Sequence, residues 1–263
     1  MPSRSGQSLH PLIEWNKAME IRNCTALVTG ANRGVGLAFT QALLEAGARK
    51  VYAGVRQPTA MVDPRVVPVR LDVTSAGDIE RVAAQCADVN LLINNAGVML
   101  SKPALADGAV AAFRSELDVN VLGLLQMMQA FAPILSRNGG GGIVNMLSVV
   151  SLYIYPFNGT YGATKHAAKA LTDAARIQLH AQGTHVLGVY AGFIDTDMAA
   201  AVEGAKTSPT QVATRALEGM RQRRGHVFAD DYANFFEAAM REDPSRIEQE
   251  MQRQWDQGRP FKR

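Results

Sequence analysis

The stretch that decides the fold is CTALVTGANRGVG, residues 24–36. It opens with a short apolar run that contains β-branched residues, and this composition predicts a β-strand. Three glycines follow the strand, at Gly30, Gly34 and Gly36, and the helical periodicity of GVGLAFTQALLEAGA begins at the last two. A strand that turns into a helix through glycines is typical of a βαβ unit, so the stretch predicts a parallel sheet.

The same alternation of strand and helix continues along the chain. Six more apolar runs predict strands, at residues 50–55, 65–73, 89–97, 142–150, 184–192 and 225–229. Helical periodicity predicts helices at residues 34–48, 76–87, 109–137, 161–183, 208–224 and 231–257. The nearly continuous apolar strands indicate that helices cover both faces of the sheet. We therefore expect an α/β fold, a single Rossmann-type domain with a doubly wound parallel sheet of about seven strands, at residues 21–263 after an N-terminal extension at residues 1–20.

Composition limits the classes of function. The 263 residues are 47% hydrophobic and 19% charged, which is enough apolar material for a full core. The net charge of +3 comes from scattered basic residues, unlike the clustered basic face of a nucleic-acid-binding protein. Cys24 and Cys86 form no disulfide framework, and the histidines have no metal-ligand spacing. The chain has no evident signal peptide, and no window approaches the roughly 18 apolar residues of a membrane span. We expect a cytoplasmic protein that binds neither nucleic acid nor membrane.

The glycine turn also predicts a ligand. Glycines at a strand-to-helix turn let backbone amides approach a pyrophosphate at the helix N-terminus. The spacing is Gly-x-x-x-Gly-x-Gly, which differs from the common Gly-x-Gly-x-x-Gly fingerprint. A glycine-rich connection without a ligand is the alternative. The residues expected to hold a dinucleotide here are Gly30, Asn32, Arg33, Gly34, Val35 and Gly36.

The end of the second predicted strand discriminates between nicotinamide cofactors. NAD sites usually carry an acidic residue about 20 positions after the last glycine, where it binds the ribose hydroxyls. Here that region contains Arg56, and the first acidic residue beyond it is Asp63. Together with Arg33, this guanidinium suits a 2′-phosphate, so the sequence favours NADP(H), with NAD(H) as the alternative. After the third strand, Asp72 is a candidate for the adenine amino group or for a helix cap, and Val73 for packing on the adenine ring.

With these motifs in place, the sequence resembles the short-chain dehydrogenase/reductase family, in its classical length class, over residues 24–198. TGANRGVG matches the family's cofactor turn, and NNAG, residues 94–97, matches the motif that ends the fourth strand and stabilises the sheet. AGFIDTDM, residues 191–198, aligns with the family's Pro-Gly segment, although Ala191 replaces the proline. By this resemblance, further cofactor-binding residues are Asn94, Ala96, Gly97, Gly192, Ile194 and Thr196, the last at the carboxamide.

The resemblance also covers the family's catalytic residues. They are Asn120, Ser148, Tyr161 and Lys165, with 13 positions from 148 to 161. Tyr161 is expected to be the general acid in carbonyl reduction and the base in alcohol oxidation, because a nearby cation lowers a phenol's pKa from about 10. Lys165 supplies that cation. By the resemblance, Lys165 and Tyr161 also contact the cofactor, Ser148 orients the substrate oxygen, and Asn120 holds a water that relays protons.

Position suggests which residues line the substrate pocket. They are Val150, Tyr155 and Phe193, with Met99 and Met198. This apolar and aromatic set has no charge clamp, so we expect a hydrophobic ketone, aldehyde or secondary alcohol. Residues 197–209, where the family carries its substrate lid, form a short segment, which predicts an open or modest pocket. The family resemblance further implies a homodimer or homotetramer.

Other functions and other roles fit parts of this pattern. An imine reductase would use the same site for a C=N bond. A non-catalytic NADP-binding regulator would keep the fold, but such proteins usually lose the tyrosine or the lysine. An epimerase or dehydratase shares the pair, yet its larger substrate domain does not fit in 263 residues with this glycine spacing. Structurally, Ser148 could cap a strand end, Asn120 could be a buried residue bonded to backbone, and Tyr161 could be a half-buried aromatic.

Overall fold

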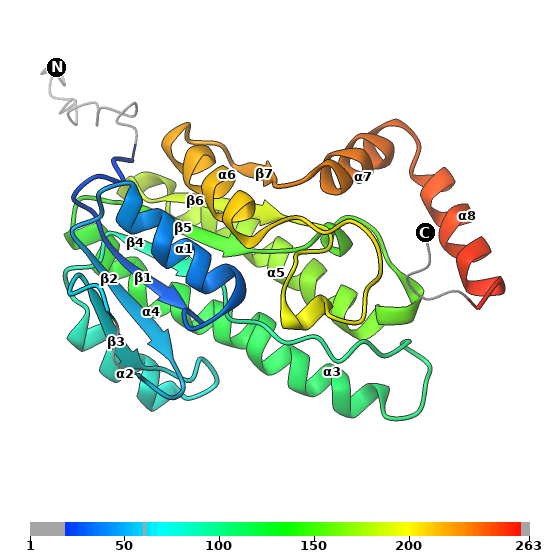
Figure 1. Ribbon diagram of the computed structural model, residues 1–263, viewed down its shortest axis with the longest axis horizontal. Helices are drawn as coiled ribbons and strands as arrows, with labels where there is room; N and C mark the ends of the chain where they lie inside the picture. Colours follow the sequence, from blue (N-terminus) through cyan, green and yellow to red (C-terminus); the bar gives the residue numbers. More distant parts are fainter. Residues whose placement is uncertain (1–18, 60–61, 259–263) are drawn as a thin grey trace, which may run out of the picture.

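The computed structural model describes residues 19–59 and 62–258, so nearly all of the expected N-terminal extension lies outside the described residues. The strands are β1 Thr25–Thr29, β2 Lys50–Val55, β3 Val66–Arg70, β4 Leu91–Asn94, β5 Gly142–Met146, β6 His185–Tyr190 and β7 His226–Phe228. Within the described residues they form one parallel sheet in the order β3-β2-β1-β4-β5-β6-β7 (Figure 1). Each observed strand lies within the residue range of a predicted strand. The predicted doubly wound α/β fold is confirmed.

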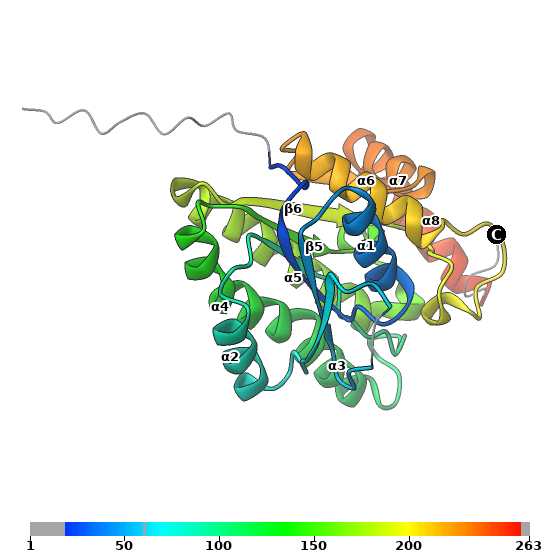
Figure 2. The ribbon, with the colours of Figure 1, turned by 60° about the vertical axis from the view of Figure 1, so that its left-hand side comes forward.

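Helices cover both faces of the sheet. They are α1 Gly34–Glu45, α2 Ala76–Gln85, α3 Ala109–Leu117, α4 Leu124–Arg137, α5 Gly159–Gln178, α6 Pro209–Arg221, α7 Asp231–Glu242 and α8 Pro244–Asp256. Helices α1 and α6 lie on one face, and α2, α4 and α5 lie on the other (Figure 2). Each face buries its own apolar core, with Phe39 and Leu43 on the first and Phe131 and Leu135 on the second. Removing this apolar surface from water is the main stabilising contribution.

The predicted helix at residues 109–137 contains a feature that the sequence did not reveal. A π-helical turn, Asp118–Gly123, separates α3 from α4, and such turns are frequent at functional sites. By length and composition this helical segment is apolar enough to cross a membrane, although half of its most apolar window is buried inside the protein. The expectation that no window reaches this limit is therefore wrong. Its buried residues, such as Met127 and Phe131, belong to the core under the sheet.

Three elements differ from their predictions at residues that shape the cleft described below. β4 ends at Asn94 and β5 at Met146, so the apolar residues that follow form loops at the carboxyl edge of the sheet. The predicted C-terminal helix is divided into α7 and α8 at Pro244, which has no N–H to continue a helix. Both helices lie at the right-hand end of the molecule in Figure 1.

Candidate active site

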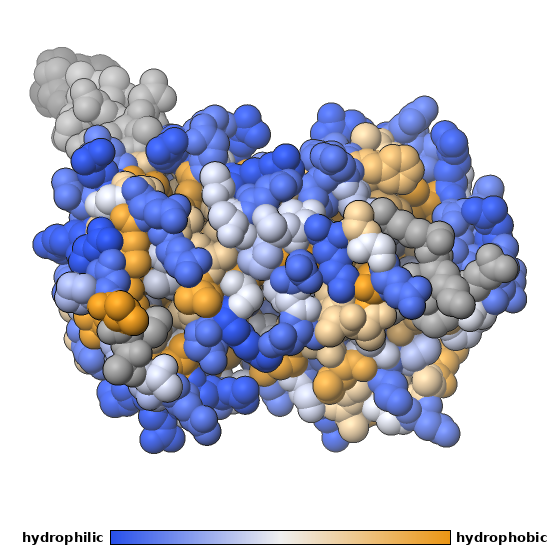
Figure 3. Space-filling view, viewed as in Figure 1, coloured by the Kyte–Doolittle hydropathy of each residue, from blue (hydrophilic) through white to orange (hydrophobic). Residues whose placement is uncertain are grey.

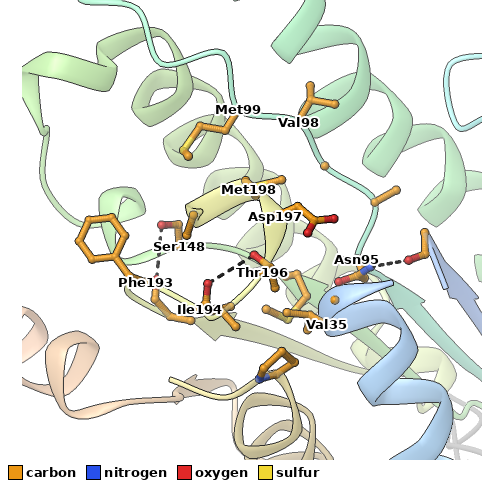
Figure 4. A pocket seen from close by; sticks show the side chains of 18 of the residues that line it. Val35, Asn95, Val98, Met99, Ser148, Phe193, Ile194, Thr196, Asp197 and Met198 are labelled. Atoms are coloured by element: carbon orange, nitrogen blue, oxygen red, sulfur yellow. Dashed lines mark hydrogen bonds between the residues drawn. The ribbon is translucent and has the colours of Figure 1, made fainter. Parts of the chain in front are cut away.

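A cleft of about 1110 Å³ opens at the carboxyl ends of the strands. β2 and β4 pair with opposite sides of β1, so the loops after β1 and β4 diverge here, where doubly wound sheets bind their ligands. Figure 4 shows Val35 and Asn95 at one end of this cleft and Ser148 and Phe193 at the other, with Thr196 between them. We call these the turn end and the pocket end.

At the turn end, backbone faces the cleft. Gly30 and Gly34 have φ angles of +67° and +52°, which favour glycine. A Cβ at Gly36 would overlap the Gly30 carbonyl oxygen and lie 2.6 Å from Asn95 Nδ2. α1 follows directly, with Arg33 as its N-cap, and among the described residues no side chain caps its first amides. This uncapped N-terminus, with Gly34 and Gly36 in its first turn, fits a phosphate group, which the helix dipole stabilises.

Thr29 and Asn95, two residues that the sequence analysis did not single out, tie the turn to the end of β4. Asn95 Nδ2 donates to the carbonyl oxygens of Thr29 at 2.9 Å and Gly30 at 3.3 Å, and Asn95 N donates to Thr29 Oγ1 at 2.9 Å. The structure corrects the expectation for Asn94. Its buried side chain does not line the cleft but donates to Asn145 Oδ1 at 2.9 Å, because successive strand residues face opposite sides of a sheet.

The two arginines expected at a cofactor phosphate lie in different settings. Both line the cleft and both are exposed. The Arg33 guanidinium forms an ion pair with Asp197 at 2.8 Å, which links the glycine turn to the segment after β6. Arg56 forms no such ion pair within the described residues. Its guanidinium can therefore bind a ligand without first breaking an ion pair.

Asp72 lines the cleft as expected, but its carboxylate is already hydrogen-bonded. It accepts from the backbone N–H of Thr74 at 2.9 Å and from the Thr74 hydroxyl at 2.7 Å, and these bonds hold the Asp72 pKa below its usual value. The alternative role of Asp72 as a helix cap is not observed, because Ser75 caps α2. Val73 also lines the cleft and packs against Gly123 of the π-helical turn.

Three of the four candidate catalytic residues line the cleft close to one another. Ser148 follows β5, and Tyr161 lies in the first turn of α5. The Ser148 hydroxyl lies close enough to the Tyr161 hydroxyl to favour the phenolate and lower its pKa. Ser148 Oγ also donates to the Ala191 carbonyl at 3.4 Å and accepts from Val150 N at 3.4 Å. Lys165 lies one turn beyond Tyr161, with its Nζ 5.6 Å from the centroid of the Tyr161 ring. The helix therefore brings the phenol and the ammonium to one face.

Burial controls the protonation of this pair. Tyr161 is 8% exposed, and this burial is the main cause that raises its pKa. The Ser148 hydroxyl lowers the Tyr161 pKa, and the negative charge of Glu116 raises it further. Burial lowers the pKa of Lys165 to about 8, and its Nζ donates to the Met146 carbonyl at 2.9 Å. The pKa of Tyr161 is therefore raised in the chain by itself, opposite to the expected fall, because desolvation of the phenolate dominates. At neutral pH the phenol is protonated and the lysine is mainly cationic.

Asn120 lies behind the cleft and not in its wall. It belongs to the π-helical turn, is buried, and is fully engaged with neighbouring groups. Its Nδ2 donates to the Val98 carbonyl at 2.8 Å and to Thr164 Oγ1 at 3.1 Å, and its Oδ1 accepts from Val98 N at 2.9 Å. These bonds match the structural role considered above and hold the loop after β4 against α5. The proton relay through Asn120 stays a prediction.

The predicted pocket residues come together at the pocket end. Those lining it are Val150, Tyr155, Phe193, Met99 and Met198. The sequence analysis missed Tyr153, Tyr232 and Gln254, which also line the cleft. Tyr232 belongs to α7 and Gln254 to α8, and no local motif marks either of them. The pocket was expected to be open or modest in size, and these helices form a wall on one side of it. In Figure 3 apolar residues gather on the right-hand half of the face, where the C-terminal helices and the segment after β6 lie.

The segment after β6 lies between the two ends of the cleft. Gly192, Ile194 and Thr196 all line the cleft, and Thr196 Oγ1 donates to the Ile194 carbonyl at 3.3 Å (Figure 4). Ala191, which stands where the family has proline, is buried, and its carbonyl accepts from Val149 N at 2.9 Å. The alanine at this position therefore keeps the turn packed against the segment after β5.

Comparison with known proteins places the chain in a family. The family model described as short chain dehydrogenase matches residues 24–207. A sorbitol dehydrogenase of Cereibacter sphaeroides is 33% identical over 187 residues, 67% of this chain and 73% of the relative. A 3α-hydroxysteroid dehydrogenase of Mediterraneibacter gnavus is 30% identical over 205 residues, 73% of this chain and 82% of the relative. A short chain dehydrogenase from Burkholderia cenocepacia J2315, crystallised in complex with NADP, has 37% identity and a TM-score of 0.86 over 89% of this chain and 99% of its own. The chain belongs to the short-chain dehydrogenase/reductase family of oxidoreductases.

Proposed function

We propose that the protein transfers a hydride between NADP(H) and a hydrophobic ketone, aldehyde or secondary alcohol. The observation that carries this proposal is the position of the Tyr161 and Ser148 hydroxyls. They lie close together in a cleft with a glycine turn at one end and an aromatic pocket at the other. A dinucleotide at the turn end and a carbonyl compound at the pocket end would meet at these two hydroxyls.

The residues of the chain divide the chemistry among them. A nicotinamide cofactor supplies the hydride when bound, and the glycine turn, Ile194 and Thr196 would hold it. As the carbonyl carbon gains a C–H bond and the C=O π bond breaks, Tyr161 donates its proton to the oxygen, which leaves an alcohol and a phenolate. Ser148 donates a hydrogen bond to the same oxygen and stabilises its developing charge. In alcohol oxidation the same proton returns to the Tyr161 phenolate.

Lys165 would stabilise the phenolate between turnovers. With a pKa of about 8 it is mainly cationic at pH 7, and its ammonium lies close to the Tyr161 ring. The positive charge of an oxidised nicotinamide ring would add to this effect and offset the rise in pKa that burial causes. The alternation between phenol and phenolate then needs a route for protons, and we place Asn120 and its loop on that route.

The preference for NADP(H) over NAD(H) rests on Arg56 and Arg33. Both line the turn end, where a 2′-phosphate would lie, and guanidinium groups bind phosphate oxygens in a forked geometry. The similar Burkholderia cenocepacia protein was crystallised with NADP, which supports this choice.

The aromatic pocket supports a hydrophobic substrate. The two named relatives act, by their names, on a sugar alcohol and on a steroid. Membership of the family therefore does not fix the substrate class, and the proposal for this protein rests on its pocket. Here the pocket is lined by rings and aliphatic side chains such as Tyr155, Phe193 and Val150. We further expect one domain over residues 21–263, a cytoplasmic location, and a homodimer or homotetramer.

The test is NADPH consumption over a panel of ketones, aldehydes and imines, measured for the native protein and Tyr161→Phe. Loss of a general acid lowers kcat by about 10²- to 10⁴-fold, so we expect a decrease of that size. The matched control is Tyr52→Phe, whose hydroxyl bonds Asp88 at 2.9 Å outside the cleft and whose loss should leave kcat near native.

Each outcome bears on the proposal. Full turnover by Tyr161→Phe would refute the role of the phenol. Consumption of NADPH with imines alone would make the protein an imine reductase. NADPH binding by fluorescence, without turnover of any compound in the panel, would favour a non-catalytic regulator.

A further inference from the structure

The C-terminal helices close the pocket end of the cleft, which hydride transfer by itself does not require. Tyr232 of α7 and Gln254 of α8 line the cleft. Helix α8 is anchored beside it by the ring of Trp255, whose centroid lies 5.0 Å from that of Phe157. Buried residues of α7 and α8 share one apolar cluster with Tyr161. The wall is therefore continuous with the proposed catalytic group.

Aromatic rings make up most of this wall. Tyr153 stacks on Phe236 with centroids 4.2 Å apart and an interplanar angle of 13°. The Tyr232 ring lies 4.7 Å from Phe236 and 5.8 Å from Phe193. The rings that line the cleft, Tyr153, Tyr232 and Phe193, each present a flat apolar face, with Tyr232 and Phe193 tilted by 44° to one another. Such faces favour a ligand that is itself flat and apolar.

The wall also has one polar point among its rings. The hydroxyl oxygens of Tyr153 and Tyr232 are hydrogen-bonded at 3.2 Å, and both residues line the cleft. A phenol oxygen carries one donor and two acceptor positions, so a ligand hydroxyl or carbonyl can join such a pair. Because this pair is uncharged, it suits a neutral polar group better than an ionised one.

Tyr232 is held firmly at the segment after β6. Asp230 is 3% exposed and accepts hydrogen bonds from Ala233 N at 2.7 Å, which caps α7, and from Gly192 N at 2.8 Å. A Cβ on Gly192 would lie 2.6 Å from Cδ1 of Tyr232, so the ring rests directly on the glycine backbone. The position of Tyr232 is therefore set by the same turn that lines the middle of the cleft, which makes it a pre-organised contact.

We propose that Tyr232 and Tyr153 determine substrate specificity, and that they select a flat, uncharged carbonyl compound or alcohol with a second hydroxyl or carbonyl group. The rings contact the flat body, and the hydroxyl pair binds the second polar group. This inference rests on the proposed function, because it presupposes carbonyl chemistry in this cleft.

The test compares two bicyclic ketones that differ by one hydroxyl group on the ring remote from the ketone. The native protein should reduce the hydroxylated ketone with the higher kcat/KM. Tyr232→Phe and Tyr153→Phe keep the rings and remove one hydroxyl each, so each should lower this preference roughly three- to tenfold, mainly through KM. Tyr232→Ala should also reduce the preference for bicyclic over linear ketones.

A control on the same helix separates this effect from general disturbance of α7. Phe235 is 62% exposed and does not line the cleft, so Phe235→Leu should leave the preference unchanged. Unchanged preference in both tyrosine-to-phenylalanine variants, or no native preference for the hydroxylated ketone, would overturn the inference and leave the proposed function intact. A native protein that reduces no carbonyl compound would instead refute the proposed function, and this inference with it.

Discussion

The turn end and the pocket end of the cleft are built in different ways. The turn end is made of backbone from two short segments, the turn after β1 and the end of β4, with Asn95 joining them. The pocket end is made of side chains from distant parts of the chain, such as Tyr153, Phe193 and Tyr232. A site made of backbone has little freedom to change, whereas a site made of side chains can be altered one residue at a time. This difference suits a cofactor shared across a family and a substrate that varies within it.

The largest effect that would test this contrast is expected from Gly36→Ala. The new Cβ would overlap a backbone carbonyl and lie 2.6 Å from Asn95 Nδ2, and the hydrogen bonds from Asn95 to the turn hold both segments in place. We expect a loss of about 3 kcal/mol or more in the free energy of unfolding, together with loss of NADPH binding. Urea unfolding and NADPH fluorescence titration measure the two.

Two other glycines serve as its controls. Gly77 in α2 has open space around its Cα, so Gly77→Ala should change the unfolding free energy by less than about 1 kcal/mol. Gly192→Ala meets the Tyr232 side chain, which can move, so its cost should fall between the two. If Gly36→Ala were as mild as Gly77→Ala, the turn would not be the rigid backbone site described above.

Lys165→Met removes the buried charge beside Tyr161, and at pH 7 it should change the free energy of unfolding by on the order of 3 kcal/mol. The folded protein lowers the lysine pKa from 10.5 to about 8, so the buried charge costs stability at pH 7. Because the unfolded state binds more protons between pH 8 and 10.5, the native protein regains that stability as pH rises through this window. Lys165→Met should therefore be more stable than native at pH 7, and the gap should shrink below about 1 kcal/mol at pH 10. Urea unfolding at pH 7 and pH 10 measures the difference in the free energy of unfolding between the variant and the native protein. An equal difference at both pH values would contradict the lowered pKa of Lys165.

Arg56→Asp tests whether the side chains at the turn end read the cofactor phosphate. Losing charged hydrogen bonds and adding a carboxylate should lower the ratio of kcat/KM for NADPH to that for NADH about ten- to thirtyfold. Arg246→Asp makes the same change of charge on an exposed residue of α8 that does not line the cleft, and it should leave the ratio unchanged. If both variants kept the native ratio, Arg56 would not contribute to a preference for NADP(H).

The smallest effect is expected from Asp197→Asn. Its ion pair with Arg33 joins side chains that are 80% and 69% exposed, so its loss should change the unfolding free energy by less than about 1 kcal/mol. The released guanidinium becomes available to a cofactor phosphate, so the KM for NADPH should fall a few-fold at low salt. High salt should remove the difference, because exposed charges are screened. A raised KM would show that Asp197 itself supports the cofactor.

The success of the sequence-based predictions follows the same contrast between the two ends. The glycine turn, the seven strands and the tyrosine–lysine pair were all predicted because each depends on residues close together in the chain. The π-helical turn was missed, because no pattern in the sequence distinguished it from the α-helices on either side. Asn94 was predicted at the cofactor site, whereas Asn95 is the residue of the two that lines the cleft, because the motif does not tell which of two adjacent residues faces it. The pKa of Tyr161 was predicted to fall, because the sequence does not show how deeply the phenol is buried.

By itself, the sequence determined the order of strands and helices, the glycine turn and the spacing of Ser148, Tyr161 and Lys165. These depend on the allowed conformations of glycine, on hydrophobic periodicity and on the helical repeat, which are local properties. Only the tertiary structure decided that Tyr232 rests on Gly192 and that Tyr161 is too buried to ionise easily. Such contacts and burial come from packing between elements that are distant in the chain, where many sequences satisfy the same local pattern.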